Sequence, residues 1–176
     1  SICSTTGDQA TPKIATTSDG GSYITWFDNR GGSYAVYLQK LNKYGVAQFP
    51  ANGLLISSNP QSSSLQDFNI DVDASDNAVI VFTDQRNGST LNPFAYLISP
   101  SGAFLWGPNG VSLTDSTNIS QNVPVVAATS DGNYVFAWTY SSGPRRIAYQ
   151  KLNAAGTPQW LPLPKLRGTG SENFEY

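Results

Sequence analysis

The sequence predicts an all-β protein of the β-propeller type, with three blades that are four-stranded antiparallel sheets and form an incomplete ring. The first observation is a repeat: a tight turn leads into an apolar strand that ends on an aromatic residue, at the evenly spaced positions Trp26, Phe82 and Trp138. The second is that each repeat holds about four strand patterns over about 55 residues, as propeller blades do. The third is composition, because 12% of the residues are charged and 16 are glycine, which is typical of short strands joined by tight turns.

The repeat divides the chain into three predicted blades. The first covers 1–53, the second 54–110 and the third 111–165, and 166–176 begin a further repeat or form a tail. Closed propellers use about four to eight blades. Three repeats therefore leave the ring incomplete.

The strands of the first blade follow from its turns and its alternation. Residues 12–17 form the first expected strand, and the turn at Asp19 leads into a second strand at 22–27. A third strand at 34–41 alternates apolar and polar residues, and a turn that ends at Gly45 closes it. Asparagine-glycine turns then precede the last strand of the first two blades.

A second aromatic residue recurs four positions after the glycine of this turn. The three copies are Phe49, Trp106 and Trp160, after Gly45, Gly102 and Gly156. An aromatic side chain at one place in every blade suits packing between adjacent sheets, because each ring buries about 150–250 Å².

An aspartate and an arginine follow the aromatic strand in two of the three blades. They are Asp28 with Arg30 and Asp84 with Arg86, and the third copy has Tyr140 and Ser142 instead. Loop aspartates usually bond to nearby backbone, so we expect an ion pair or turn cap at a blade corner. A catalytic role for these carboxylates is the alternative.

The segment 67–73 concentrates oxygen ligands. Asp67, Asn69, Asp71 and Asp73 alternate with apolar residues, so on a strand they share one face. Hard oxygen ligands suit Ca²⁺, and these four residues are the predicted metal site. The alternative is a solvated face, since the pattern lacks the glycine and glutamate of a calcium-binding EF-hand loop. No other cofactor is predicted.

The remaining composition excludes several functions. The chain has no histidine and one cysteine, which removes the commonest general base and the commonest zinc ligands, so no catalytic residue is predicted. Cys3 is interpreted as a small buried residue. The net charge is −2 and the largest basic cluster is Arg145-Arg146, so nucleic acid is not an expected partner. No apolar run reaches the roughly 20 residues of a membrane span.

Four segments carry a resemblance to a known type of repeat. They are 3–14, the Trp-x-Asp-x-Arg pattern at 26–30, 36–42 and 52–56. Together they resemble the propeller-type repeats of large secreted and surface proteins from bacteria with a type IX secretion system. The resemblance spans the chain, implies an extracellular or cell-surface location, and brings no agreed catalytic residues. The third copy departs from the pattern at Tyr140.

These observations lead to three hypotheses for function. The first is a non-enzymatic extracellular segment that acts in adhesion or in self-assembly of a surface structure such as a filament, with other copies or further repeats of a longer chain as partners. The alternative is a carbohydrate-binding, lectin-like module, for which Tyr34, Tyr37, Tyr44 and Tyr140 are candidate sugar platforms. The third is an enzyme of the sialidase or glycosidase type. In the first hypothesis Ser1–Cys3 completes a sheet elsewhere.

Overall fold

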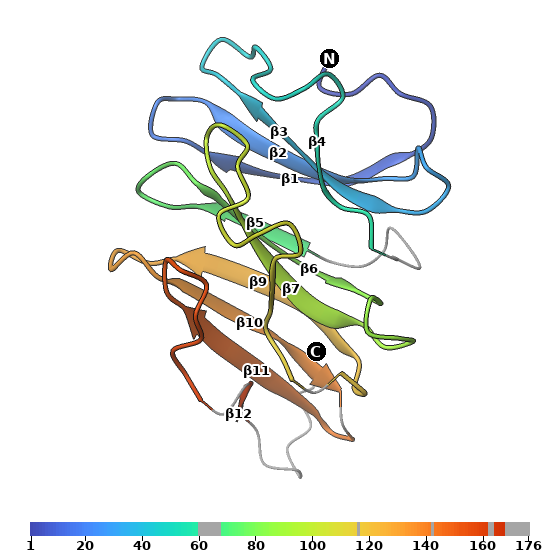
Figure 1. Cartoon of the computed structure of the whole chain (residues 1–176), viewed down its shortest axis with the longest axis vertical. Coiled ribbons are helices and arrows are strands. Elements are labelled where there is room, and N and C mark those ends of the chain that lie inside the picture. Colours follow the sequence, from blue (N-terminus) through green and yellow to red (C-terminus); the bar gives the residue numbers. More distant parts are fainter. Residues whose placement is uncertain (60–67, 116, 142, 162–163, 168–176) are drawn as a thin grey trace.

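The computed structural model describes residues 1–59, 68–115, 117–141, 143–161 and 164–167, and these form three separate four-stranded sheets (Figure 1). Blade 1 contains β1 (Gln9–Thr16), β2 (Ser22–Asp28), β3 (Ala35–Leu41) and β4 (Leu54–Ser57). Blade 2 contains β5 (Phe68–Val72), β6 (Ala78–Asp84), β7 (Asn92–Ile98) and β8 (Val111–Ser112). Blade 3 contains β9 (Gln121–Ala128), β10 (Tyr134–Ser141), β11 (Arg145–Leu152) and β12 (Lys165–Arg167).

The fold class predicted from the sequence is confirmed. In every sheet the strands lie in chain order and each pair is antiparallel, as in a propeller blade. The three blades stack one on the next, with β5 in contact with both β1 and β9, and they do not close into a ring (Figure 1). The described part of the chain contains no helix that could cross a membrane.

Each sheet includes the short strand that follows the asparagine-glycine turn or its equivalent. β4 pairs with β3, and β8 pairs with β7. The predicted boundaries at 53 and 110 therefore fall just before the last strand of a sheet, and assign that strand to the following repeat.

Two ends of the stack differ in their connections. The strands β1, β5 and β9 begin at one end of the stack, which we call the start end. At this end the loop 29–34 joins β2 to β3, and the loop 85–91 joins β6 to β7. At the opposite hairpin end, five-residue turns such as 17–21 and 73–77 return the chain.

Apolar side chains fill both seams between blades. One cluster joins blade 1 to blade 2 and includes Phe27 and Phe82, and another joins blade 2 to blade 3 and includes Val81 and Trp138. Successive residues of a strand point to opposite faces. All seven residues of β6 and all seven of β7 are therefore buried, because blade 2 has a neighbour on each face.

The first strands of blades 1 and 3, β1 and β9, each contain a β-bulge opposite the recurring tryptophan. Thr11 and Pro12 oppose Trp26, and Val123 and Pro124 oppose Trp138. The first residue of each bulge has a positive φ, 50° and 53°, which is a rare backbone conformation for a β-branched residue. Blade 2 has no bulge at this place, because Phe82 pairs directly with Phe68.

Hydrogen bonds from tyrosines reinforce both seams at the hairpin end. Tyr23 of blade 1 donates to the carbonyl oxygen of Asp76 (2.9 Å), whose carboxylate accepts from the backbone and hydroxyl of Ser18 (both 2.7 Å). Tyr134 of blade 3 donates to Asp73 of blade 2 (2.6 Å). Burial, together with these acidic neighbours, raises the pKa of both tyrosines, so the hydroxyls stay protonated and able to donate.

Candidate functional site

Asp28 and Arg30 form an ion pair at the corner of blade 1. The Asp28 side chain is fully buried, and it accepts hydrogen bonds from Arg30 Nη2 (2.6 Å), Arg30 Nε (2.9 Å) and Trp26 Nε1 (3.0 Å). Arg30 also donates to the carbonyl oxygen of Asn52 (2.9 Å), and its guanidinium lies 3.9 Å above the ring of Tyr37. The pair therefore ties the end of β2 to the loop before β4.

The surroundings of Asp28 keep it ionised. Burial by itself raises the pKa of the carboxyl, but the hydrogen bonds from Arg30 and Trp26 outweigh burial and hold that pKa far below its usual value. The hydrogen bond to Asp28 likewise raises the pKa of Arg30. A buried carboxylate with both oxygens bonded is poorly placed to transfer a proton to a substrate.

Blade 2 repeats the pair without the tryptophan. Arg86 bonds to Asp84 through Nε and Nη2, the latter at 2.6 Å, and donates to the carbonyl oxygen of Asn109 (2.7 Å). Its guanidinium lies 3.6 Å above the ring of Phe94. The burial of Arg86 lowers its pKa, and the hydrogen bond to Asp84 more than reverses that effect.

Blade 3 uses an amide in place of the carboxylate. Trp138 Nε1 donates to Oε1 of Gln121 (2.6 Å), which is fully buried at the start of β9. Tyr140 is also buried, and Ser142 lies outside the described residues. At the end of its second strand, each blade thus pairs the buried polar groups with a different set of partners. This indicates that these groups have a structural role.

The predicted calcium face points at blade 3. Asn69 accepts from the backbone N–H of Val126 (3.4 Å) and Asp71 from that of Ala128 (2.8 Å), so the two side chains cap the free edge of β9. Asp73 accepts from Tyr134 and from the backbone of its own turn. Asp67 lies outside the described residues, among which no three Asp, Glu, Cys or His side chains gather closely enough to hold a metal ion. The calcium site stays a prediction.

Four of the six recurring aromatic residues, Phe49, Phe82, Trp106 and Trp138, lie in the clusters where adjacent blades meet. Trp26, Phe82 and Trp138 are 2%, 0% and 2% exposed. Phe49 and Trp106 are buried at the two seams, and Trp160 is half-buried against Tyr149 on the free face of blade 3.

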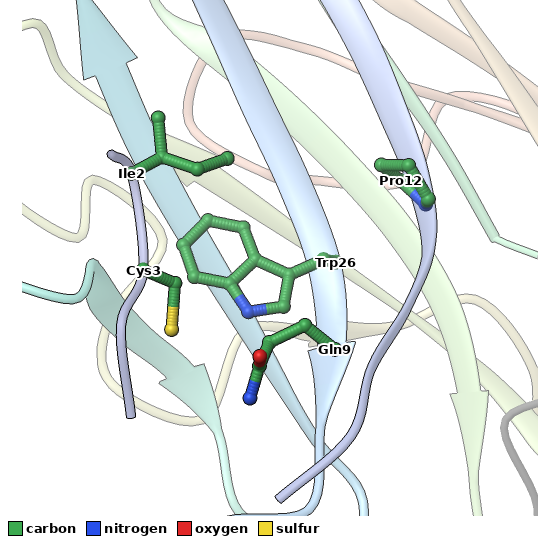
Figure 2. Close-up of a pocket in the computed structure, with 5 residues that line it drawn as sticks. All are labelled: Ile2, Cys3, Gln9, Pro12 and Trp26. Carbon is green, nitrogen blue, oxygen red and sulfur yellow. The ribbon is translucent and has the colours of Figure 1, made fainter. Parts of the chain in front are cut away.

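A cavity of about 200 Å³ lies beside Trp26, as Figure 2 shows. Ile2 and Cys3 lie on one side of the indole and Pro12 on the other, and Gln9 completes the lining (Figure 2). With Trp26 only 2% exposed, little of the indole is open to a ligand, so it serves as a core residue rather than a sugar platform.

The N-terminal segment is part of blade 1. Ser4 donates its backbone N–H to Asn52 (2.9 Å), and Arg30 Nη2 donates to the sulfur of Cys3 (3.3 Å). Ile2 and Cys3 therefore cover the tryptophan of their own blade and form no strand within this chain. The expectation that they complete a sheet of another copy or of further repeats stays a prediction. Cys3 is half-buried and its thiol is free.

Asp8 is a carboxylate that the sequence reasoning missed. It is exposed and immediately precedes β1 at the start end. Asn29 fixes it from both sides: its side-chain oxygen accepts from the Asp8 backbone (2.6 Å), and its amide donates to the Asp8 carboxylate (3.3 Å). The signal was available, because Asp8 and Asp67 each directly precede the first strand of a blade in the sequence.

Comparison with solved structures identifies glycoside hydrolases of similar fold. An endo-1,5-α-L-arabinanase from Thermotoga petrophila RKU-1 matches 90% of this chain with 17% identity and a TM-score of 0.56. A thermostable family-43 glycoside hydrolase matches 93% with 14% identity and a TM-score of 0.50. This chain spans 40% and 55% of the lengths of those proteins. No family model and no curated protein matches the sequence.

These matches correct the first functional hypothesis. A non-enzymatic segment for adhesion or self-assembly does not fit a propeller whose solved counterparts are glycoside hydrolases, and that interpretation was wrong. The error came from weighing missing histidine and cysteine heavily, because glycoside hydrolysis depends on carboxyl groups instead.

Proposed function

We propose that this protein is carbohydrate-active and contributes a propeller of the glycoside-hydrolase type that binds and cleaves a polysaccharide outside the cell. The observation that carries the proposal is the match of all three blades to an endo-arabinanase over 90% of the chain. An extracellular location accords with a polymeric substrate, which is too large to enter a cell intact.

The start end is the proposed place of contact with the glycan. Binding and catalytic residues lie disproportionately on loops that a rigid scaffold positions. The loops 29–34 and 85–91 are at this end. At the hairpin end, the turns that join the first two strands of each blade bond through their aspartate side chains to their own backbone.

Asp8 is the proposed functional carboxylate. Glycoside hydrolases use two carboxyl groups, one as general acid and one as base or nucleophile. Asp8 is exposed, immediately precedes β1 and is oriented by Asn29, so it can meet a substrate. Asp28 and Asp84 cannot fill this role, because each is fully buried in an ion pair.

A second candidate function is glycan binding without cleavage. This function is favoured because the carboxylates of Asp28 and Asp84 already accept hydrogen bonds from Arg30 and Arg86. A propeller that has lost its reactive carboxylates would still present the polar loops of the start end to a sugar chain.

Both candidates are tested with the purified chain and a panel of polysaccharides that includes linear 1,5-α-arabinan. Release of reducing ends reports cleavage, and retarded migration in polysaccharide-containing gels reports binding. We expect cleavage to fall at least about 100-fold in Asp8→Asn, as for loss of a general acid or base. Asp131→Asn is the matched control, because Asp131 is an exposed carboxylate at the hairpin end.

The outcomes separate the candidates. Binding without reducing ends supports the second function over the first. Equal cleavage by the Asp8→Asn variant removes Asp8 from the mechanism. Neither binding nor cleavage with any polysaccharide contradicts both.

A further inference from the structure

The two seams differ at the hairpin end in what joins the turns of adjacent blades. In the seam between blades 1 and 2, the carboxylate of Asp76 accepts from the backbone N–H and the hydroxyl of Ser18 (both 2.7 Å). Tyr23 donates to the carbonyl oxygen of Asp76 (2.9 Å), and the ammonium group of Lys40 lies 5.7 Å from the centre of the Tyr23 ring. Polar side chains of both blades therefore close this seam.

The corresponding turns of the seam between blades 2 and 3 lack these side chains. In all three blades the turn has two backbone hydrogen bonds, from its first residue to its fifth and from its fourth to its first, so the turn positions correspond. Ala74 of blade 2 corresponds to Ser18, and Gly132 of blade 3 corresponds to Asp76. The hydroxyl and the carboxylate that join the first pair of blades are thus absent from the second pair.

The strands that adjoin these turns differ in the same direction. Tyr23 and Lys40 pair across β2 and β3, whereas Val79 and Leu97 pair at the same place across β6 and β7. Leu105, whose backbone N–H donates to Leu97, is 50% exposed. The residues of the other blades that correspond to Leu105 are Gln48 and Gln159. Blade 2 is therefore apolar at the place where blade 1 presents a hydroxyl and an ammonium group to its neighbour.

A cavity of about 280 Å³ lies between blades 2 and 3 at this place. Its lining includes four of the substituted positions, Ala74, Leu97, Leu105 and Gly132. Sites for small molecules usually measure about 300–1,000 Å³. The cavity is close to the lower end of that range, so it suits a ligand of the size of one sugar ring.

The other side of the cavity is polar and held in place. Asp73 accepts from the hydroxyl of Tyr134 (2.6 Å), from the side-chain amide of Asn77 (2.8 Å) and from two backbone N–H groups of its own turn. Burial raises the pKa of Asp73, but the hydrogen bonds from Tyr134 and Asn77 more than reverse this effect and hold the pKa below its usual value. The cavity therefore has a fixed negative charge in its wall, which disfavours an anionic ligand.

We propose that this cavity binds one neutral sugar unit of a polysaccharide, at the opposite end of the blades from Asp8. A sugar ring has C–H groups on its faces and hydroxyl groups at its edge. The C–H groups would pack on Leu105, and the hydroxyl groups would bond to Tyr134 and to the exposed hydroxyl of Ser130. A uronic acid is disfavoured because its carboxylate would approach Asp73. This inference rests on the proposed function and adds a second point of contact with the polymer.

Nuclear magnetic resonance titration of the purified chain with neutral arabino-oligosaccharides tests the proposal, because it reports on the two ends of the blades separately. We expect saturable shifts of the backbone amide signals of 73–77 and 129–133. Oligogalacturonates, which carry a carboxylate on every sugar, should shift these signals less at the same concentration.

A variant that closes the cavity gives the sharpest result. Ala74→Ser combined with Gly132→Asp rebuilds the pair that joins blades 1 and 2. Gly132 has a positive φ of 74°, as Asp76 has (59°), and a Cβ at Gly132 meets no atom of the described residues within 4 Å. The double variant should weaken binding at 73–77 at least about 10-fold, as expected for the loss of two hydrogen bonds. Gly20→Asp, which adds the same side chain at the same turn position of blade 1, is the control.

A second variant, Leu105→Gln, introduces the residue that blades 1 and 3 have at this position and should also weaken binding. Circular dichroism checks that each variant is folded. Shifts confined to the start end overturn this inference and leave the proposed function standing. No shift at either end, together with no cleavage, contradicts both. Binding at 73–77 that the double variant and Leu105→Gln leave unchanged, or that Gly20→Asp weakens equally, overturns the inference.

Discussion

Blades 1 and 2 follow one strand plan but differ in what covers them. Ile14 pairs with Ile24 in blade 1, and Ile70 pairs with Ile80 at the same place in blade 2. Ile70 is 8% exposed and Ile14 is 65% exposed. The same residue in the same position is core in one blade and surface in the other, because blade 1 faces blade 2 on one side only. Burial in this molecule is set by the neighbouring blade.

The blades also differ at the aromatic position. Trp26 and Trp138 each oppose a proline-containing bulge and donate to an acceptor, Asp28 or Gln121. Phe82 has no polar atom and faces a regular strand. Tryptophan, which has a larger ring and an N–H donor, thus occurs opposite a bulged strand. Phenylalanine, which has a smaller ring, occurs opposite a regular strand.

The largest expected effect is in the centre of blade 2. Phe82→Ala should lower the free energy of unfolding by about 3–5 kcal/mol, because it leaves a cavity between blades that are close-packed on both sides. Urea denaturation followed by fluorescence measures this. A loss below about 1 kcal/mol would mean that the seam between blades 1 and 2 is loosely packed.

Asp28→Asn should lower the free energy of unfolding by a smaller amount, about 2–3 kcal/mol near neutral pH, because Arg30 and Trp26 lose a charged acceptor. The folded-state pKa of Asp28 lies below its ordinary value of 3.8, so the carboxylate stabilises the fold above that pH. This contribution disappears as the pH falls through the folded-state pKa.

The difference in the free energy of unfolding between the parent and Asp28→Asn should therefore shrink on acidification. Denaturation at several pH values tests this. Asp84→Asn is the control from blade 2, where the recurring aromatic residue, Phe82, donates no hydrogen bond. A gap that is constant from pH 7 to pH 2 would argue against the ion pair as its source.

Phe82→Trp tests the link between tryptophan and the bulge. We expect a loss of about 1–3 kcal/mol from overpacking, because β5 lacks the extra residue that accompanies tryptophan in β1 and β9. Trp138→Phe, in a blade that has the bulge, is the reciprocal variant. A stabilised Phe82→Trp protein would show that the bulge is unrelated to ring size.

The sequence was sufficient to predict the repeated sheets and insufficient to predict the contacts between them. Even spacing of Trp26, Phe82 and Trp138 predicted three sheets, because each blade reuses one local pattern. The alternation at 67–73 predicted a shared face for Asn69 and Asp71, but not that β9 lies opposite and uses both as acceptors. That contact joins residues far apart in the chain, and no local pattern encodes it. Pro12 and Pro124 could have indicated the bulges, since proline inside a strand is confined to edges and bulges.

The smallest expected effect is at Ile14, the exposed counterpart of Ile70. Ile70→Ala should cost about 2–4 kcal/mol, in line with other isoleucine truncations in cores. Ile14→Ala should cost less than about 0.5 kcal/mol in dilute solution, because exposed side chains contribute little. A cost for Ile14→Ala that equals that of Ile70→Ala would mean that Ile14 is buried, and the difference between the two blades would be lost.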